Sequence, residues 1–353
     1  NWGTNGIVID SNGLNYQGDD DTYTVEYGTD GTALHIVYSG ATNGWIPTLD
    51  KTVADVPSKG NSEGIFGFGE QASVGYVGMT NLVSNAGVVA SDVAAVGTAR
   101  GGSAACEYDG DKAIFGFGRD AVGNTNVTNL VSNTGVVASD QAATTGTVRY
   151  YLAACSFGGD KGIFGFGHDA SSIYYSLTNL VSNTGVVASD VAGVGTDRRL
   201  LAACEYGGDK AIFGFGRKAA EAITNVTNLV SNTGVVASDQ AATTGTARSL
   251  LAACSFGGDK GIFGFGSTGS DVGMTNLVSN TGVVASDVAA TGTARREISA
   301  TQYGPDKGIF GFGKISSSRS ALTNLVSNTG VVASDQAATT GQARGILSAC
   351  SFN

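Results

Sequence analysis

Short apolar runs separated by Gly, Asn and Asp recur along most of the chain. One unit reads LAACSF, the turn GGDK, GIFGFG, a variable loop, TNLVSN, the turn TG, and VVASD. The run IFGFG occurs six times, at a spacing of 47 to 50 residues. Its isoleucines are Ile65, Ile114, Ile163, Ile212, Ile262 and Ile309. Because no segment has the 3.6-residue period of an amphipathic helix, the pattern predicts an all-β repeat protein with four short strands per unit.

The two ends of the repeat region predict closure. The first copy begins with the IFGFG strand at Gly64 and has no LAACSF strand before it, whereas the chain ends on such a strand, Leu347 to Phe352. TNLVSN also occurs six times, so six units are expected. A period of this length, rich in glycine, is typical of propeller blades. We therefore expect a six-bladed β-propeller, closed by the C-terminal strand so that no sheet edge is left exposed.

The copies alternate between two types. Cys106 and Cys204 are followed by Glu-Tyr, whereas Cys155 and Cys254 are followed by Ser-Phe. The ring should therefore have pseudo-threefold symmetry built from pairs of blades, as duplication of a two-blade unit would produce. Such symmetry would also suit a threefold partner or a homo-oligomer.

Residues 1–59 lack the repeat and are expected to form a small β domain ahead of the propeller, residues 60–353. The segments DTYTVEYG and ALHIVYSG alternate as strands do around Thr29-Asp30-Gly31, which predicts a hairpin. A domain of this length can bury little core alone. We interpret it as an attachment module.

The unit resembles a kelch repeat in the order of its parts: GTAR, the small-residue strand LAAC, a glycine turn, IFGFG, a variable loop, and a pair of strands that begins with TN. The resemblance covers residues 60–353 and implies a propeller. The chain departs from it where Gly-Phe-Gly replaces the double glycine and where valines such as Val131 replace outer aromatic residues. In addition, residues 36–47 and the TNLVSNTGVVASD repeats resemble modules of phage tail, fibre and virion proteins.

Composition narrows the possible partners. With 20 basic and 30 acidic residues, the net charge of −10 opposes a phosphate-binding surface, so no nucleic-acid partner is expected. No apolar run is long enough for a membrane span. The five cysteines share one repeat position, without a CxxC pair or a neighbouring histidine. They are interpreted as free, buried residues, and neither a metal nor a cofactor is expected.

The sequence contains few candidate catalytic residues. His35 and His168 are the only histidines, and they lie far apart in the sequence. The repeated aspartates of the GDK turns are interpreted as turn residues. Those that end the fourth strand, such as Asp92, are expected to join neighbouring blades through charge-assisted hydrogen bonds to the repeated arginines. The chain is therefore interpreted as non-enzymatic.

The copies differ mainly in two sets of loops. One set lies between IFGFG and TNLVSN, and the other follows the repeated arginine. In an up-and-down blade both sets lie on one face, and variable loops on a rigid scaffold are where recognition is usually built. The opposing interpretation is drift in exposed loops. The candidate binding residues are Tyr76, Tyr150, Tyr151, His168, Tyr174, Tyr175, Arg217 and Lys218.

These observations favour a structural and binding protein of a phage virion or tail fibre. Its varied face would contact a host-surface glycan or another virion protein, and residues 1–59 would attach it to other virion proteins. The alternatives are a secreted or cell-surface bacterial adhesion module and a propeller carbohydrate-active enzyme.

Overall fold

The computed structural model describes residues 7–17, 25–27, 35–47 and 63–352, apart from 143, 145, 242–244, 290, 338 and 340. The chain divides into two compact units, Asn1–Ser58 and Lys59–Asn353. The expected division lay one residue later. The predicted all-β class is confirmed, because the described residues form many small antiparallel sheets and one short 3₁₀ turn, Ala219–Glu221. No helix among them is long and apolar enough to cross a membrane.

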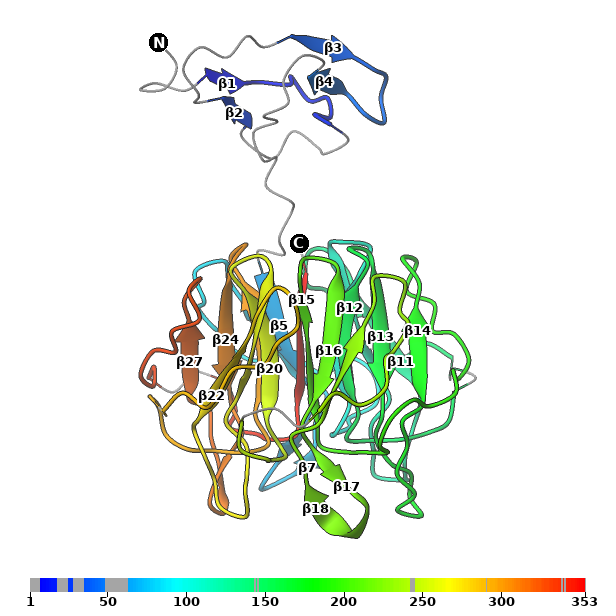
Figure 1. Cartoon of the computed structure of the whole chain (residues 1–353), viewed down its shortest axis with the longest axis vertical. Helices are drawn as coiled ribbons and strands as arrows, with labels where there is room; N and C mark the ends of the chain where they lie inside the picture. Colours follow the sequence, from blue (N-terminus) through cyan, green and yellow to red (C-terminus); the bar gives the residue numbers. More distant parts are fainter. Residues whose placement is uncertain are drawn as a thin grey trace. The chain divides into compact units, whose positions relative to one another are not determined.

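Six three-stranded antiparallel sheets make up the second unit (Figure 1). Their strands, from the innermost outward, are β9 (Ala104–Tyr108), β10 (Lys112–Gly116) and β11 (Thr128–Val131); β12 (Ala153–Phe157), β13 (Lys161–Gly165) and β14 (Thr178–Val181); β15 (Ala202–Tyr206), β16 (Lys210–Gly214) and β19 (Thr227–Val230); β20 (Ala252–Phe256), β21 (Lys260–Gly264) and β22 (Thr275–Val278); β23 (Ser299–Tyr303), β24 (Lys307–Gly311) and β27 (Thr323–Val326); and β28 (Ser348–Phe352), β5 (Glu63–Gly67) and β8 (Thr80–Val83).

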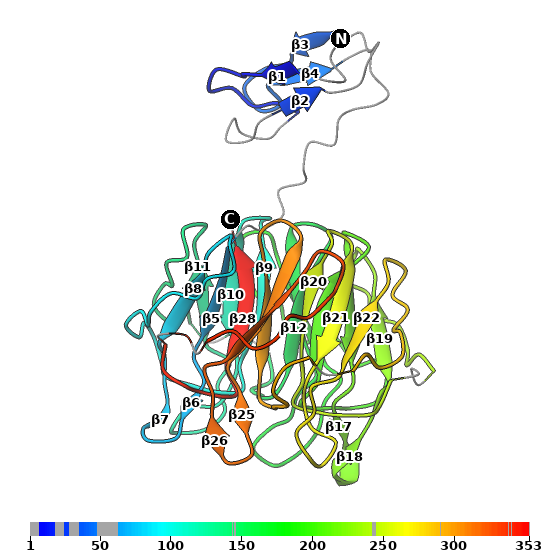
Figure 2. The same ribbon diagram turned by 90° about the vertical axis from the view of Figure 1, so that its left-hand side faces the viewer.

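The last of these sheets joins the two ends of the repeat region. β28 pairs with β5 in a register that places Ser348 opposite Gly67 and Phe352 opposite Glu63, and Figure 2 shows β28 in red beside β5. The innermost strands β9, β12, β15, β20, β23 and β28 each contact the next, and β28 also contacts β9. The C-terminal strand therefore occupies the place that LAACSF strands occupy in the other five sheets.

The fourth segment of each unit, VVASD, differs from the prediction. It forms isolated bridges rather than a strand: Val83 is opposite Val89, and Thr80 is opposite Val93. The two pairs are out of register by one residue, which is the signature of a β-bulge. The side chain of Asn81 spans the bulge by donating to the Ala90 carbonyl at 3.0 Å. The expected four-stranded sheet is thus three strands with a bulged fourth segment.

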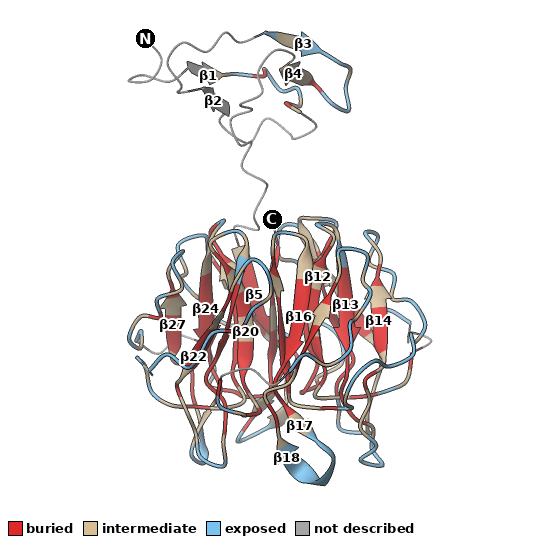
Figure 3. Cartoon of the chain, in the orientation of Figure 1, coloured by how far each residue is buried: buried red, intermediate tan, exposed pale blue. Residues whose placement is uncertain are grey.

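The IFGFG motif explains how successive sheets pack. Its first glycine leaves room for a phenylalanine of the next sheet, because a Cβ on Gly165 would lie 2.8 Å from Cζ of Phe213. The same contact recurs at every junction and returns to the start, where Gly311 faces Phe66 of the first copy. The buried apolar residues accordingly form six clusters, each between two successive sheets. Figure 3 shows in red the buried residues along the strands of these sheets.

An arginine is fully buried at each junction. The six are Arg100, Arg149, Arg198, Arg248, Arg295 and Arg344, all 0 % exposed. Each guanidinium lies 4.0–4.7 Å from the ring centroid of the second phenylalanine of IFGFG in the preceding sheet. Burial lowers the pKa of each arginine to about 10. The guanidinium stays charged at neutral pH, so its donors must be matched by buried acceptors.

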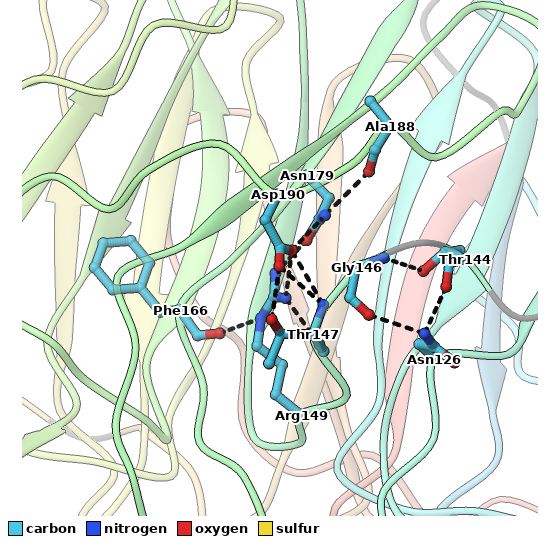
Figure 4. A network of polar contacts seen from close by, with 9 residues as sticks. All are labelled: Asn126, Thr144, Gly146, Thr147, Arg149, Phe166, Asn179, Ala188 and Asp190. Atoms are coloured by element: carbon cyan, nitrogen blue, oxygen red, sulfur yellow. Dashed lines mark hydrogen bonds and ion pairs between the residues drawn. The ribbon is translucent and has the colours of Figure 1, made fainter.

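Figure 4 shows how Arg149 is satisfied. Its Nε donates to the Phe166 carbonyl at 2.7 Å and its Nη1 to the Thr147 carbonyl at 3.1 Å, while Nη2 donates to Oδ1 of Asn179. The carboxylate of Asp190 lies 3.5 Å from Nη1 and also accepts hydrogen bonds from the backbone and side chain of Thr147. One polar network therefore ties the loop that enters a sheet to the bulged segment that leaves it.

The aspartates that were expected to pair with the arginine that follows them instead pair with the preceding one. Arg100 lies 4.0 Å from Asp140 of the next copy rather than beside Asp92. Asp92 pairs with Arg344 at 3.6 Å, across the junction of the last and first copies. Each aspartate therefore pairs with the arginine of the loop that enters its own sheet.

The first unit contains two small antiparallel pairs within its described residues. β1 (Ile7–Ile9) pairs with β2 (Val25–Tyr27), and β3 (Ile36–Tyr38) pairs with β4 (Trp45–Pro47). The predicted hairpin would have joined β2 to β3. Instead β3 finds its partner through the turn that ends at Gly44, where the rings of Tyr38 and Trp45 meet at 5.4 Å. The turn Thr29-Asp30-Gly31 lies outside the described residues.

Candidate functional site

The two sets of varied loops pair with each other through their backbones. In every copy the residue directly after IFGFG lies opposite the residue directly after the buried arginine. We call these the outer and middle positions. The outer positions are Glu70, Arg119, His168, Arg217, Ser267 and Lys314, and the middle positions are Gly101, Tyr150, Arg199, Ser249, Arg296 and Gly345. Repetition of the backbone therefore presents a different pair of side chains on each sheet.

The next residue along, the inner position, has a left-handed backbone in all six copies, with φ between 47° and 61°. These residues are Gly102, Tyr151, Leu200, Leu250, Glu297 and Ile346. Only glycine adopts this conformation at no cost. Each N–H donates to the carbonyl of the inner residue in the preceding copy, at 2.8–3.1 Å, and Gly102 donates to Ile346. The six hydrogen bonds form a closed circuit that offsets the strain of the left-handed residues.

The inner positions line a small cavity of about 70 Å³, together with the residues that follow them, which are leucines, Ile298 and Ser103. Glu297 is the only charged residue in its lining. That carboxylate is held by Arg319, whose other Nη lies 2.6 Å from Glu70. The cavity mouth therefore carries a fixed ion-pair network on the side formed by the first and last copies.

Aromatic side chains gather on the opposite side of the mouth. The ring of His168 lies 4.0 Å from that of Tyr150 and 5.8 Å from that of Tyr174, while Tyr151 lies 4.6 Å from Tyr150, between ring centroids. Arg199 covers the face of Tyr174 at 5.2 Å. Four of the predicted binding residues thus form one stacked cluster, which we call the aromatic cluster.

His168 supports this cluster from beneath. It is 2 % exposed, and its Nε2 lies 2.9 Å from Nη1 of Arg199 while its Nδ1 lies 3.3 Å from the Tyr150 carbonyl. Because an arginine can only donate, Nε2 accepts and Nδ1 carries the proton. Burial, and then the charge of Arg199, lower the pKa of His168 to about 4. In this geometry His168 is a neutral ring that holds its neighbours in place, and it does not provide a ligand contact.

Glu221 links the aromatic cluster to the neighbouring copy. Its carboxylate accepts a hydrogen bond from Tyr174 and lies 2.6 Å from Arg199 and 3.2 Å from Arg217. The Tyr174 hydrogen bond, followed by those of the arginines, lowers the pKa of Glu221 to about 2. Arg217 is therefore part of this group, on the small hairpin β17 (Arg217–Lys218) and β18 (Ala222–Ile223).

The remaining predicted residues lie around this group. Tyr76, on the hairpin β6 (Glu70–Gln71) and β7 (Gly75–Tyr76), lies beside Gly101. Tyr175 donates to Oδ2 of Asp169 at 2.9 Å and takes no part in the stack. Lys218 is exposed. A third such hairpin joins β25 (Lys314–Ile315) to β26 (Ser318–Arg319).

Sequence reasoning missed Arg119, Arg199, Glu221 and the Glu297–Arg319 pair. Arg119 and Arg199 occupy the same repeat positions as the predicted His168 and Tyr150. A systematic alignment of the six copies would have identified both arginines. Glu221 and Arg319 lie inside loops of unequal length, where the repeat gives no register.

The other end of the inner strands carries a polar ring. Glu107, Glu205 and Gln302 alternate there with serines, and Ser156 donates to Glu205 at 2.7 Å. Burial raises the pKa of Glu205 to about 7. The pseudo-threefold pattern is visible here, because the three longer side chains belong to alternate copies.

We expect Glu205→Gln to remove a pH dependence of stability. Because the folded pKa is raised above the usual value of 4.5, the protein is more stable below pH 4.5 and loses that stability as pH rises toward 7. The variant should gain about 1–3 kcal/mol over the parent at pH 8 and little at pH 4, measured by urea unfolding at both values. The converse change, Gln302→Glu, should introduce the same loss. Equal gains at both pH values would contradict the assignment.

The predicted state of the cysteines is confirmed: all five are free and buried. Burial raises the pKa of the Cys254 thiol to about 12, so it stays protonated at neutral pH. Within the described part of the chain, no three His, Cys, Asp or Glu side chains are grouped so that they could hold a metal ion.

Comparison of the chain with protein-family models found no match, and comparison with curated proteins found no relative.

Proposed function

We propose that the second compact unit, Lys59–Asn353, is a six-bladed β-propeller. Its blades would be the six sheets, and β28 would be its closing strand. Three observations support this: β28 pairs with β5, the glycine–phenylalanine contacts return from Gly311 to Phe66, and the hydrogen-bond circuit of the inner positions has no break. Propellers avoid long exposed edges by radial repetition, and pairing of the two chain ends extends that protection to the first blade.

We infer that this propeller is a non-enzymatic binding scaffold whose varied face recognises a glycan on a host surface. The observation that carries the inference is the aromatic cluster, which occupies positions that differ from copy to copy while the rest of each blade is uniform. Half-buried Tyr150 and Tyr174 offer apolar faces and hydroxyl groups together. Rigid aromatic surfaces with a few fixed polar groups suit the mixed apolar and polar surface of a sugar.

Binding is favoured over glycoside hydrolysis by the state of the carboxylates at this face. A hydrolase needs one carboxyl group with a raised pKa to act as the acid. Glu221 has the opposite shift, and Glu297 is held in an ion pair with Arg319. His168 is buried and has both ring nitrogens engaged.

We place this function in a phage virion or tail fibre. The resemblance of residues 36–47 and of the TNLVSNTGVVASD repeats to virion modules supports this placement. The first compact unit would attach the propeller to other virion proteins, and copies of the chain would associate as a homo-oligomer around the particle's symmetry axes.

Binding can be tested on a glycan array with the full chain. Tyr150→Ala and Tyr174→Ala should each weaken binding to the best glycan by about tenfold or more, since a buried aromatic contact contributes at least about 1.4 kcal/mol. Val186→Ser, at a 64 % exposed residue of the uniform turns, is the matched control and should bind as the parent does. Equal binding by all variants would contradict the site, and release of reducing ends from the bound glycan would favour the enzyme alternative.

The placement is tested separately by immunogold electron microscopy of the native source. We expect label on the tail or fibres of phage particles. Label on cell envelopes, or only on free protein, would favour the adhesion module.

A further inference from the structure

Only one copy has glycine at both the middle and the inner position, because Gly345, at the middle position of the last copy, is followed by Ile346. The second sheet is entered by Gly101 and Gly102, at the middle and inner positions. A Cβ on Gly101 would lie 3.1 Å from Cδ1 of Tyr76, and one on Gly102 would lie 3.0 Å from Cδ1 of Tyr151 and 3.3 Å from Cδ2 of Tyr150. Three tyrosines therefore pack around the two glycines, together with Ile346, whose Cδ1 would lie 2.7 Å from a Cβ on Gly101. We call this group the tyrosine notch.

Arg119 lies at the edge of the notch. Its backbone exchanges two hydrogen bonds of 2.9 Å with Gly101, and its guanidinium lies 5.6 Å from the ring centroid of Tyr150. The residue is exposed. The notch thus has a cation fixed at a known place in the repeat.

This cation has no carboxylate partner within 4.0 Å among the described residues, whereas Arg199, Arg217, Arg296 and Arg319 on the same face each have one. The adjacent Asp120 does not supply it, because its Oδ1 accepts hydrogen bonds from the backbone of Val122 and Gly123 in its own loop. Arg119 therefore offers a free fork of donors, and that fork is the geometry that matches a carboxylate.

We propose that the tyrosine notch binds an acidic sugar, with Arg119 holding the sugar carboxylate and the tyrosines contacting the pyranose ring. The proposal rests on the glycan-binding function inferred above and names the ligand class of that site. A flat guanidinium forms two parallel hydrogen bonds to a carboxylate, and it keeps its charge at every pH of interest. Tyr76, Tyr150 and Tyr151 supply apolar faces beside it together with hydroxyl groups for the ring oxygens.

The test compares sugars that differ in the carboxylate. Binding of the full chain would be measured by calorimetry with two pairs of probes: galacturonate and galactose oligomers, and sialyllactose and lactose. We expect at least one acidic probe to bind about tenfold or more tightly than its neutral partner, as a charge-assisted contact should provide. Arg119→Gln should reduce that preference to about twofold or less and leave the affinity for the neutral probe unchanged. Added salt should weaken binding of the acidic probe more than that of the neutral one.

Lys161→Gln is the control for net charge, because it removes one positive charge from an exposed residue of the uniform turns. It should keep the preference for the acidic probe. Equal affinity for both members of each pair, or a preference that survives Arg119→Gln, would overturn the inference while leaving glycan binding in place. Loss of the preference in Lys161→Gln as well would also overturn it, since net charge rather than the guanidinium of Arg119 would then be responsible. Absence of binding to any probe and to the whole array would overturn both the inference and the proposed function.

Discussion

A chain that lacks residues 347–353 is expected to lose the cooperative fold of the second compact unit, which contains the six sheets. The deletion removes β28, which pairs with β5 along five residues and buries Cys350 and Phe352 against the next sheet. The deletion also removes Leu347, which packs against the preceding sheet. Burial of such side chains is worth about 1.5–3 kcal/mol each, so the loss should be at least about 5 kcal/mol. That amount equals the whole stability of many domains.

Urea unfolding followed by tyrosine fluorescence and circular dichroism measures this effect, because both tryptophans, Trp2 and Trp45, belong to the first unit. The informative comparison is a rearranged chain in which Leu347–Phe352 is moved ahead of Glu63 and joined by a Gly-Gly-Asp turn, as in the other sheets. It should recover the stability that the deletion removes, because the same strand then pairs with β5 through a hairpin. A truncated chain that unfolds at the same urea concentration as the parent would show that the closing strand contributes nothing.

Replacement of a buried arginine should have the next largest effect. Arg149→Met is expected to destabilise the protein by about 3–5 kcal/mol, because it leaves a buried carbonyl and an amide oxygen without their donor and the Asp190 carboxylate without its ion-pair partner. The methionine fills part of the space, so lost polar contacts rather than a cavity account for the change.

Arg119→Met is the control for this prediction. It removes the same group from an exposed position without an ion pair, and its stability should lie within about 0.5 kcal/mol of the parent. Both variants would be unfolded in guanidinium chloride, which also screens surface charges. Similar unfolding midpoints for the two variants would mean that the buried guanidinium of Arg149 does not stabilise the junction between sheets.

The sequence pattern predicted the inner three strands of each repeat because short apolar runs and the glycine turns between them are local features. The fourth segment was not resolved correctly, since the bulge depends on the side chain of Asn81 reaching across to Ala90. The partner of each buried arginine was also missed, because it depends on the fold. Asp140 approaches Arg100 since the loop that enters a sheet lies beside the last segment of the same sheet, and no local pattern encodes that contact.

The face that carries the candidate site was predicted from loop variation, but its contents were only partly foreseen. Tyrosines were chosen because they stand out in a loop, whereas Arg119 and Arg199 look ordinary until the copies are aligned. That Tyr150 stacks on His168 and that Arg199 donates to the same histidine follows from the pairing of two loop sets, which requires the fold. In the first unit, strand propensity was recognised but pairing was not, since short strands do not specify their partners.

The contact of Gly165 with Phe213 has the same form at every seam between sheets. A neighbouring contact does not: a Cβ on Gly162 would lie 2.4 Å from Sγ of Cys106, whereas Ala113 and Ala211 occupy the same repeat position in two other copies. A copy placed beside a new neighbour would therefore keep its phenylalanine contact but not every other contact of its seam. The seams thus restrict which copies could exchange places by recombination.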